Sequence, residues 1–312
     1  MSKKQLINRF VQVLGVLLGI SFITFALTYL APGDPVRTMY ASTGSMPSQN
    51  VIEQTREAMG LNKPFLVQYF NWITSCIRGD FGISYSMKKP VLDIMLIKFI
   101  PTLKLAFVSL AIMMCISIPL GMLAAINKNK IVDYIIRAYT FLGISVPNFW
   151  VGMMLLYIVA LKFKILPVVS TGDGIDKLIL PSITLAFAMS AKYTRQVRAI
   201  VLEELNKDYV VGAISRGINE KKVLWKHVFP NSLLPLLTLI GLSLGSLLGG
   251  TAVVEVIFSY PGLGNMAVSA ITSYDYPLIQ AYVLWIAFIY MIINLIIDIS
   301  YNYLDPRVRN EV

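Results

Sequence analysis

The sequence has little of the chemistry that enzymes and metalloproteins use. Its 312 residues include two cysteines, Cys76 and Cys115, which form no C-x-x-C pair, and one histidine, His227. A zinc or haem site built mainly from histidine and cysteine is therefore excluded, and no metal-ligating or catalytic residue is assigned. Charged residues make up only 14% of the chain against 56% hydrophobic residues, and the mean hydropathy is +0.67, which excludes an ordinary water-soluble globule.

Motifs for energy conversion are also absent. No G-x-x-x-x-G-K-[ST] phosphate loop occurs, so any dependence on ATP must come from a partner protein. The long apolar runs hold no acidic residue away from their ends, whereas a proton-coupled or sodium-coupled carrier more often places ionisable groups at mid-membrane. The formal net charge of +10 is interpreted as membrane topology and not as a sign of nucleic-acid binding.

The chain is rich in long apolar runs. A helix needs about 20 apolar residues to cross the hydrocarbon layer. Six runs approach or exceed that length, and they predict an all-α integral membrane protein with six transmembrane helices at residues 10–30, 105–126, 138–161, 178–191, 232–254 and 277–297. The fourth run is short, and we expect its helix to continue past Ala191.

Basic residues predict the orientation of these spans. Lysine and arginine gather before the first run, between the second and third, and between the fourth and fifth, whereas residues 255–276 contain neither. By the positive-inside rule, both termini are expected in the cytoplasm and residues 31–99 outside the membrane. The aromatic and charged residues of this long extracytoplasmic loop predict a small folded cap with helices near 51–59 and 66–78. The chain is thus expected to be a single polytopic membrane domain over 1–312, with its permease core at 100–300.

Two local patterns allow more than one interpretation. Lys192, Arg195 and Arg198 recur at helical intervals after the fourth run, so they face lipid phosphates, a partner or simply solvent. Gly241, Gly245 and Gly249 recur every fourth residue in the fifth run, which suits close helix packing within this chain, a dimer face or a moving gate.

The loop between the fourth and fifth runs, residues 208–231, reads DYVVGAISRGINEKKVLWKHVFPN. We expect a first helix through Ala213, a turn at Gly217, and a second helix that Asn219 caps and that ends before Pro230. The alternative from spacing alone is an ordinary interfacial helical loop.

This loop resembles the EAA loop of ABC importer permeases, E-A-A-x3-G-x9-I-x-L-P. Ala213, Gly217 and Pro230 match its last alanine, its glycine and its proline, while Val211, Gly212, His227 and Phe229 replace other motif residues. These replacements are similar to the dipeptide, oligopeptide and nickel permease branch. The resemblance implies a coupling segment that docks on an ATPase through these residues: Asp208, Tyr209, Ala213, Arg216, Gly217, Trp225, His227, Pro230 and Asn231.

Further motifs along the chain resemble the first-type (B) permease subunit of the same family. They are APGDP at 31–35, GDFGISYSMKKPV at 79–91, SVPNFWVG at 145–152, VVEVIFSYPGLG at 253–264, DYPLIQAYVL at 275–284 and LDPRVR at 304–309. The resemblance implies a type I ABC importer permease fold. It also implies that Pro261, Gly262 and Gly264 form an outer mouth on which a binding protein sits.

The family implies a transport subunit and not an enzyme, in a prokaryotic cytoplasmic membrane. Its expected partners are a second homologous permease in a heterodimer, two cytoplasmic ATPases that use ATP and magnesium, and an extracytoplasmic substrate-binding protein. This chain itself is expected to bind no cofactor. Di- or oligopeptides are the favoured cargo, nickel or a metal chelate is the alternative, and a stand-alone channel or membrane sensor is the distant one.

Overall fold

The computed structural model describes residues 3–31, 33–41, 47–172 and 174–304. The described residues are mostly helical and divide into two compact units, Met1–Thr102 with Pro261–Ile292 and Leu103–Tyr260 with Ile293–Val312. Pro32 and residues 305–309, which belong to two of the family-like motifs, lie outside the described residues. Within them, four helices have the length and composition of membrane spans: Ile7–Leu30, Val91–Ile126, Glu220–Gly249 and Tyr276–Ile297.

The first unit joins a long helix to the predicted cap. It holds α1 (Lys3–Leu30), α2 (Pro35–Ala41), α3 (Gln49–Ala58), α4 (Phe65–Ile77), the start of α5 (Val91–Ile126), α13 (Leu263–Thr272) and the start of α14 (Tyr276–Leu304). The helices α3 and α4 confirm the two short helices expected near 51–59 and 66–78.

The cap packs on α1 through aromatic side chains. Phe25 of α1 lies 5.6 Å from the Phe65 ring and 5.4 Å from the Trp72 ring of α4, between ring centroids. The hydroxyl groups of Ser21 and Tyr69 are 2.8 Å apart and share a hydrogen bond in the buried contact. Because aromatic pairs add specific geometry to apolar burial, this contact makes the middle of the long loop a folded structure.

The second unit is built around one long helix. Its elements are the rest of α5, α6 (Ile131–Ser145), α7 (Asn148–Leu155), η1 (Leu156–Lys162, a π-helix), α8 (Ile175–Leu205), α9 (Asp208–Ser215), α10 (Glu220–Val223), η2 (Leu224–Val228, a π-helix), α11 (Phe229–Gly250), α12 (Ala252–Ile257) and the end of α14. Helix α8 contacts α6, α7, α11, α12 and η2. As expected, it continues well past Ala191.

The expected third span is bent. The helices Ile131–Ser145 and Asn148–Lys162 meet at an angle of 96°, so 138–161 is not one straight helix. Pro147 is the cause, because a proline pushes the preceding residue out of the helical region, and Val146 is extended at φ −90° and ψ 127°. The pair is a broken span or a re-entrant loop.

The count of six spans is not reached on length and composition alone. The described residues hold four helices that qualify as spans, or five if the bent pair counts as one span. Helix α8 is not among them. The reason is that the longest uncharged stretch of α8, residues 178–191, is short for a span, and the second half of the helix carries Lys192, Arg195 and Arg198.

Helix packing in this unit depends on small residues. A Cβ on Gly143 of α6 would lie 2.5 Å from the Cβ of Ala191 of α8, so only glycine allows this approach. Gly241 of the glycine-spaced strip likewise faces Ile297 of α14 within the chain, where an added Cβ would lie 2.3 Å from Cδ1 of Ile297. Gly249 has open space beside it, so an added Cβ at this position would meet no neighbour among the described residues.

Candidate coupling segment and outer mouth

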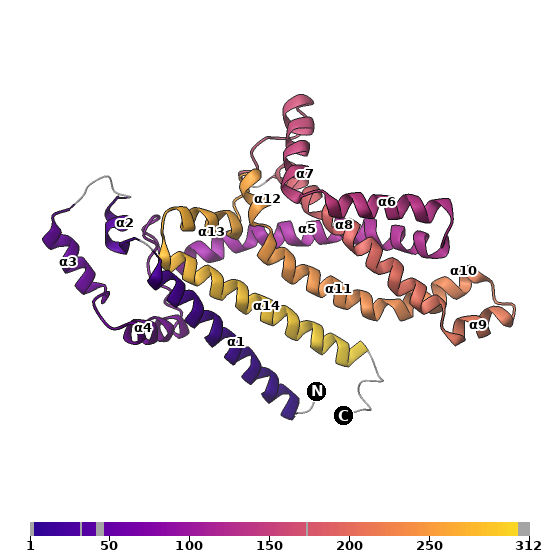
Figure 1. The fold of residues 1–312 in the computed structure, drawn as a ribbon, viewed down its shortest axis with the longest axis horizontal. Helices are drawn as coiled ribbons and strands as arrows, with labels where there is room; N and C mark the ends of the chain where they lie inside the picture. The colour runs from indigo at the N-terminus through magenta and orange to yellow at the C-terminus, as the bar shows by residue number, and fades with distance from the viewer. Residues whose placement is uncertain (1–2, 32, 42–46, 173, 305–312) are drawn as a thin grey trace. The chain divides into compact units, whose positions relative to one another are not determined.

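The segment 208–231 is a helix pair, as expected. Helix α9 ends at Ser215, Gly217 lies in the turn, and α10 begins at Glu220. The pair lies beyond the ends of α8 and α11, the two helices that lead into and out of it (Figure 1). The Asn219 side chain accepts a hydrogen bond from the Lys221 backbone N–H at 2.9 Å, which confirms it as the cap of the second helix.

Gly217 closes α9 by a Schellman motif. The Gly217 N–H donates to the Ile214 carbonyl at 2.8 Å, and the Ile218 N–H donates to the Ala213 carbonyl at 3.2 Å. This pattern needs a left-handed residue after the helix, and Gly217 has φ +80°. A Cβ at Gly217 meets no atom within 4 Å, so the requirement for glycine is conformational and not steric.

This geometry predicts that Gly217→Val and Gly217→Asn behave differently. A left-handed conformation costs a non-glycine residue about 1–2 kcal/mol, more for a β-branched residue and less for asparagine. We expect Gly217→Val to lower substrate-stimulated ATP hydrolysis of the assembled transporter by about tenfold, since about 1.4 kcal/mol corresponds to that factor. Gly217→Asn should keep most of it, and equal loss in both variants would contradict the conformational role.

The expectation that the second helix ends before Pro230 is wrong. The chain from Glu220 continues to Gly249 without a break, through the π-helical residues Leu224–Val228 into α11. In the π-helical part the Phe229 N–H donates to the Leu224 carbonyl, five residues back. Pro230 is the second residue of α11, directly after the π-helical turn, and its missing N–H leaves one helical hydrogen bond unmade there without ending the helix.

One side of the segment is buried in a hydrophobic cluster. Ala213 is 4% exposed, Val210 2% and Val228 fully buried. They pack with residues from α5, α8 and α11, and the buried members of this coupling cluster are Met122, Ala125, Val197, Val201, Val210, Ala213, Val223, Leu224, Val228 and Leu236. Among the residues predicted to dock on an ATPase, Ala213 is therefore a buried packing residue whose side chain cannot reach a partner.

Other apolar side chains of the segment are exposed. Val211 is 57% exposed, Ile214 44% and Trp225 59%, and we call these three residues the docking face. The other predicted docking residues are also exposed: Asp208, Tyr209, Arg216, Gly217, His227, Pro230 and Asn231. Val211 and Ile214 were missed because motif matching treats Val211 as a mismatch, although their spacing of three residues, one position after Val210 and Ala213, was visible in the sequence.

Polar contacts tie α9 to the end of α8. The Tyr209 hydroxyl donates to Glu204 Oε1 at 2.7 Å, and Lys207 Nζ lies 2.5 Å from Glu204 Oε2. Partial burial raises the pKa of Tyr209 and the Glu204 carboxylate adds to the rise, while a hydrogen bond with the Asn231 side chain opposes it. Tyr209 thus stays a neutral donor, and it joins both ends of the predicted docking segment.

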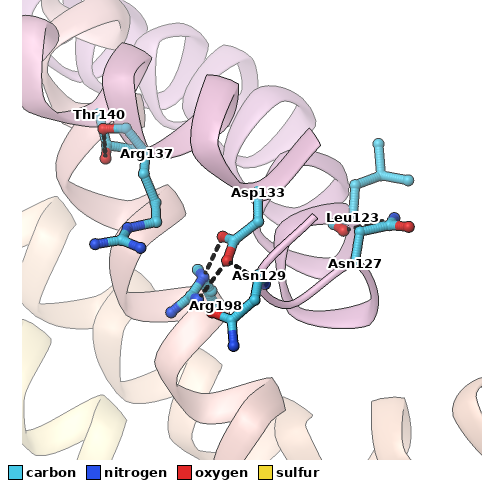
Figure 2. Close-up of polar contacts among 7 residues, drawn as sticks. All are labelled: Leu123, Asn127, Asn129, Asp133, Arg137, Thr140 and Arg198. Carbon is cyan, nitrogen blue, oxygen red and sulfur yellow. Dashed lines mark hydrogen bonds and ion pairs between the residues drawn. The ribbon is translucent and has the colours of Figure 1, made fainter. Parts of the chain in front are cut away.

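A buried ion pair fixes α8 to α6. Arg198 Nε and Nη2 donate to the two carboxylate oxygens of Asp133 at 2.7 and 2.8 Å, and Asp133 is fully buried (Figure 2). The Asn129 backbone N–H is a third donor to this carboxylate, at 3.0 Å. Arg198 is therefore engaged in an ion pair within the chain, whereas Lys192 and Arg195 are exposed. Asp133 could not be recognised from the sequence, because its partner lies 65 residues away.

The predicted outer-mouth residues are mostly buried in the first unit. Gly262 and Gly264 are buried and Pro261 is half-buried, and Gly262 precedes the first residue of α13. The Leu263 N–H donates to Thr102 Oγ1 at 2.8 Å, and Leu263 is fully buried in a cluster with Val91 and Met95. In this chain the turn is a packed anchor for α13.

Asp275 joins two motifs of the first unit. Its Oδ2 accepts hydrogen bonds from Ser84 Oγ at 2.5 Å, Ser86 Oγ at 2.7 Å and the Ser86 N–H at 3.0 Å, and the residue is fully buried. The carboxylate thus holds the G-I-S-Y-S stretch against the start of α14. No spacing rule connects positions so far apart, so the sequence alone did not indicate this contact.

We predict that Asp275→Ala loosens residues 82–90. The variant removes the acceptor of three hydrogen bonds, and bonds to a charged group are worth about 1.5–3 kcal/mol each. Hydrogen exchange of the amides of this stretch should therefore rise by at least about tenfold. Thr272→Ala, at an exposed position in the last turn of α13, is the matched control, and unchanged exchange in Asp275→Ala would refute the anchoring role.

Comparison with known proteins places this arrangement in a family. The model of the binding-protein-dependent transport system inner membrane component matches residues 117–310, and the model of the N-terminal part of such components matches residues 2–106. Solved structures share the fold. The inward-facing MetNI methionine ABC transporter matches at a TM-score of 0.58 and 16% identity, over 70% of this chain and 100% of that chain.

Curated relatives extend over nearly the whole chain. The nickel import system permease protein NikB of Staphylococcus aureus is 39% identical, over 98% of this chain and 92% of its own length. The oligopeptide transport system permease protein AppB of Bacillus subtilis is 38% identical, over 97% and 98%, and the probable D,D-dipeptide transport system permease protein DdpB of Escherichia coli is 33% identical, over 94% of each chain. The chain belongs to the family of binding-protein-dependent transport system inner membrane components and is the permease subunit of an ABC importer.

Proposed function

We propose that this permease imports di- or oligopeptides across a prokaryotic cytoplasmic membrane, as one of two similar permease subunits, with both termini in the cytoplasm. ATP and magnesium are used by two ATPase subunits and not by this chain. The positive residues of 192–226 support a cytoplasmic placement of the coupling segment.

The observation that carries the coupling role is the two-sided character of α9–η2. Its inner side is fixed by the coupling cluster and by the Schellman turn at Gly217, and its outer side presents Val211, Ile214 and Trp225. Exposed apolar residues of this size beside a charged surface are typical of a protein interface. In the proposal the docking face fits a groove of an ATPase. ATP-driven closure of the two ATPases then moves α8 and α11 as rigid bodies.

The outer mouth is proposed to be where a substrate-binding protein docks. The support is the folded cap of α3 and α4 and the packed turn at Pro261, Gly262 and Gly264. Because Gly262 and Gly264 are buried, their proposed role is to hold the mouth in shape, and the contact falls to exposed residues of the cap.

The named relatives include both peptide and nickel permeases, so the choice of cargo rests on the residues of this chain. The one histidine of the chain lies in the coupling segment, and bare nickel favours imidazole ligands. This favours peptides over free nickel ions. A nickel chelate remains the second candidate because a 39% identical relative is a nickel import permease.

An uptake assay separates these candidates. The complete transporter, purified with its native partners and reconstituted in vesicles with its binding protein, is offered labelled peptides, nickel ions and a nickel–histidine chelate. ATP-dependent peptide uptake without nickel uptake is the expected result. Nickel uptake without peptide uptake would identify nickel as the cargo. Uptake by this chain without ATP or ATPases would favour a stand-alone channel.

A further inference from the structure

A groove between α6 and α8 combines a basic end with an apolar end. It has a volume of about 870 Å³ and is lined by Arg137, Arg195 and Arg198 together with Phe141 and Ile144. The groove belongs entirely to the second unit. Figure 2 shows the Arg137 and Arg198 side chains projecting into the same region beside α6.

The basic end of the groove carries a net positive charge. Arg198 is neutralised by Asp133, which accepts both of its hydrogen bonds. Arg137 and Arg195 have no ion pair among the described residues, so three guanidinium groups face one carboxylate and leave a net charge of plus two. Arg137 also lies 5.7 Å from the centroid of the Tyr134 ring, which holds its guanidinium at the groove.

The apolar end follows along α6. Phe141 is 73% exposed and Ile144 45% exposed, and both line the groove. At 1.5 Å per residue, the step from Arg137 to Ile144 is about 10 Å along the helix axis. The basic end lies nearer the short loop at 127–130, which the positive-inside rule places in the cytoplasm, and the apolar end lies deeper in the membrane.

A buried hydroxyl group lines the groove beside the basic end. Thr194 lines the groove, its Oγ1 is buried, and it has no hydrogen bond within the described part of the chain. Buried hydroxyls are normally satisfied, so this atom indicates that a polar group belongs nearby. Phosphate oxygens accept bonds from guanidinium and hydroxyl donors alike.

We propose that this groove binds an anionic phospholipid of the cytoplasmic leaflet. Its phosphate lies between Arg137 and Arg195, and its acyl chain runs along Phe141 and Ile144. Basic pockets between transmembrane helices on the cytoplasmic side bind anionic headgroups in this way. The inference rests on the proposed orientation of the permease but not on its cargo.

The test measures lipid retention by the transporter purified with its native partners. The complex is placed in nanodiscs that contain phosphatidylglycerol and phosphatidylcholine, released into mild detergent, and its bound phospholipid is counted by native mass spectrometry. The wild type should retain phosphatidylglycerol in preference to phosphatidylcholine. Arg137→Ala and Arg195→Ala should each reduce that retention by about fivefold, the effect of one charge at a membrane surface.

Controls distinguish the rival occupants. Lys192→Ala, which removes a charge one turn away on α8 but outside the groove, should leave retention unchanged. A photoreactive residue at Phe141 should cross-link to lipid. Equal retention in the arginine variants, displacement by inorganic phosphate alone, or a cross-link only to the second permease would each overturn the proposal. Lipid retention requires no transport, so failure here leaves the transport proposal intact.

Discussion

Ala213→Asp is expected to abolish both uptake and substrate-stimulated ATP hydrolysis while the chain still inserts in the membrane. Ala213 is 4% exposed and packs in the coupling cluster, so the new carboxylate would be buried without a partner. Such a substitution costs about 3–4 kcal/mol, enough to detach α9 from its support. The measurement is uptake and ATPase activity of the reconstituted transporter beside the amount of chain in the membrane.

Ser215→Asp is the matched control for this prediction. Ser215 lies in the same helix and is exposed, so the variant adds the same charge without burying it. We expect it to retain most of the activity. Normal uptake by Ala213→Asp would show that the packed side of α9 is not needed for coupling.

Asp133→Ala is expected to have the second large effect, on stability. The variant leaves Arg198 without its bidentate acceptor in a site where Asp133 is fully buried. Removing one partner of a buried pair costs about 3–5 kcal/mol because the remaining charge is uncompensated. Thermal unfolding of the purified transporter in detergent should therefore begin at a clearly lower temperature.

The double variant Asp133→Leu with Arg198→Leu tests that reason. Replacing both partners by apolar residues removes the unpaired charge, and such replacements are often neutral or stabilising. We expect the double variant to recover much of the stability that Asp133→Ala loses. A double variant as unstable as the single one would mean that the geometry of the pair, and not burial of an unpaired charge, determines the loss.

Local signals predicted much of the fold. Long apolar runs predicted the helices α1, α5 and α14 because burial in lipid requires length and hydrophobicity, both of which are visible in a single segment. The turn at Gly217 and the cap at Asn219 were predictable for the same reason, since both depend on residues within one turn.

Features that depend on distant residues or on small changes of helix register were not predictable. The bend at Pro147 was missed because an apolar run hides a helix break, and Pro147 is the only local sign of it. The continuity through Pro230 was missed because a π-helical stretch shifts the hydrogen bonds by one residue. The contacts of Asp133 and Asp275 join positions 65 or more residues apart.

The candidate docking residues were predicted from a motif, and the structure shows that some of them are exposed and one is buried. Trp225 is exposed, as a contact residue must be, whereas Ala213 is buried and supports the contact from behind. A motif records which residue types recur but not which side of a helix each one occupies. Only the packing of Val210, Ala213 and Val228 against the cluster distinguishes the two sides.

The most direct test of the account is a photo-cross-link from Trp225 in native membranes. A photoreactive residue replaces Trp225, which is 59% exposed on the docking face, and the cross-linked product is identified by mass spectrometry. The account predicts an adduct with a protein that contains a G-x-x-x-x-G-K-[ST] phosphate loop. An active transporter in which Trp225 cross-links only to lipid, or to nothing, would contradict it.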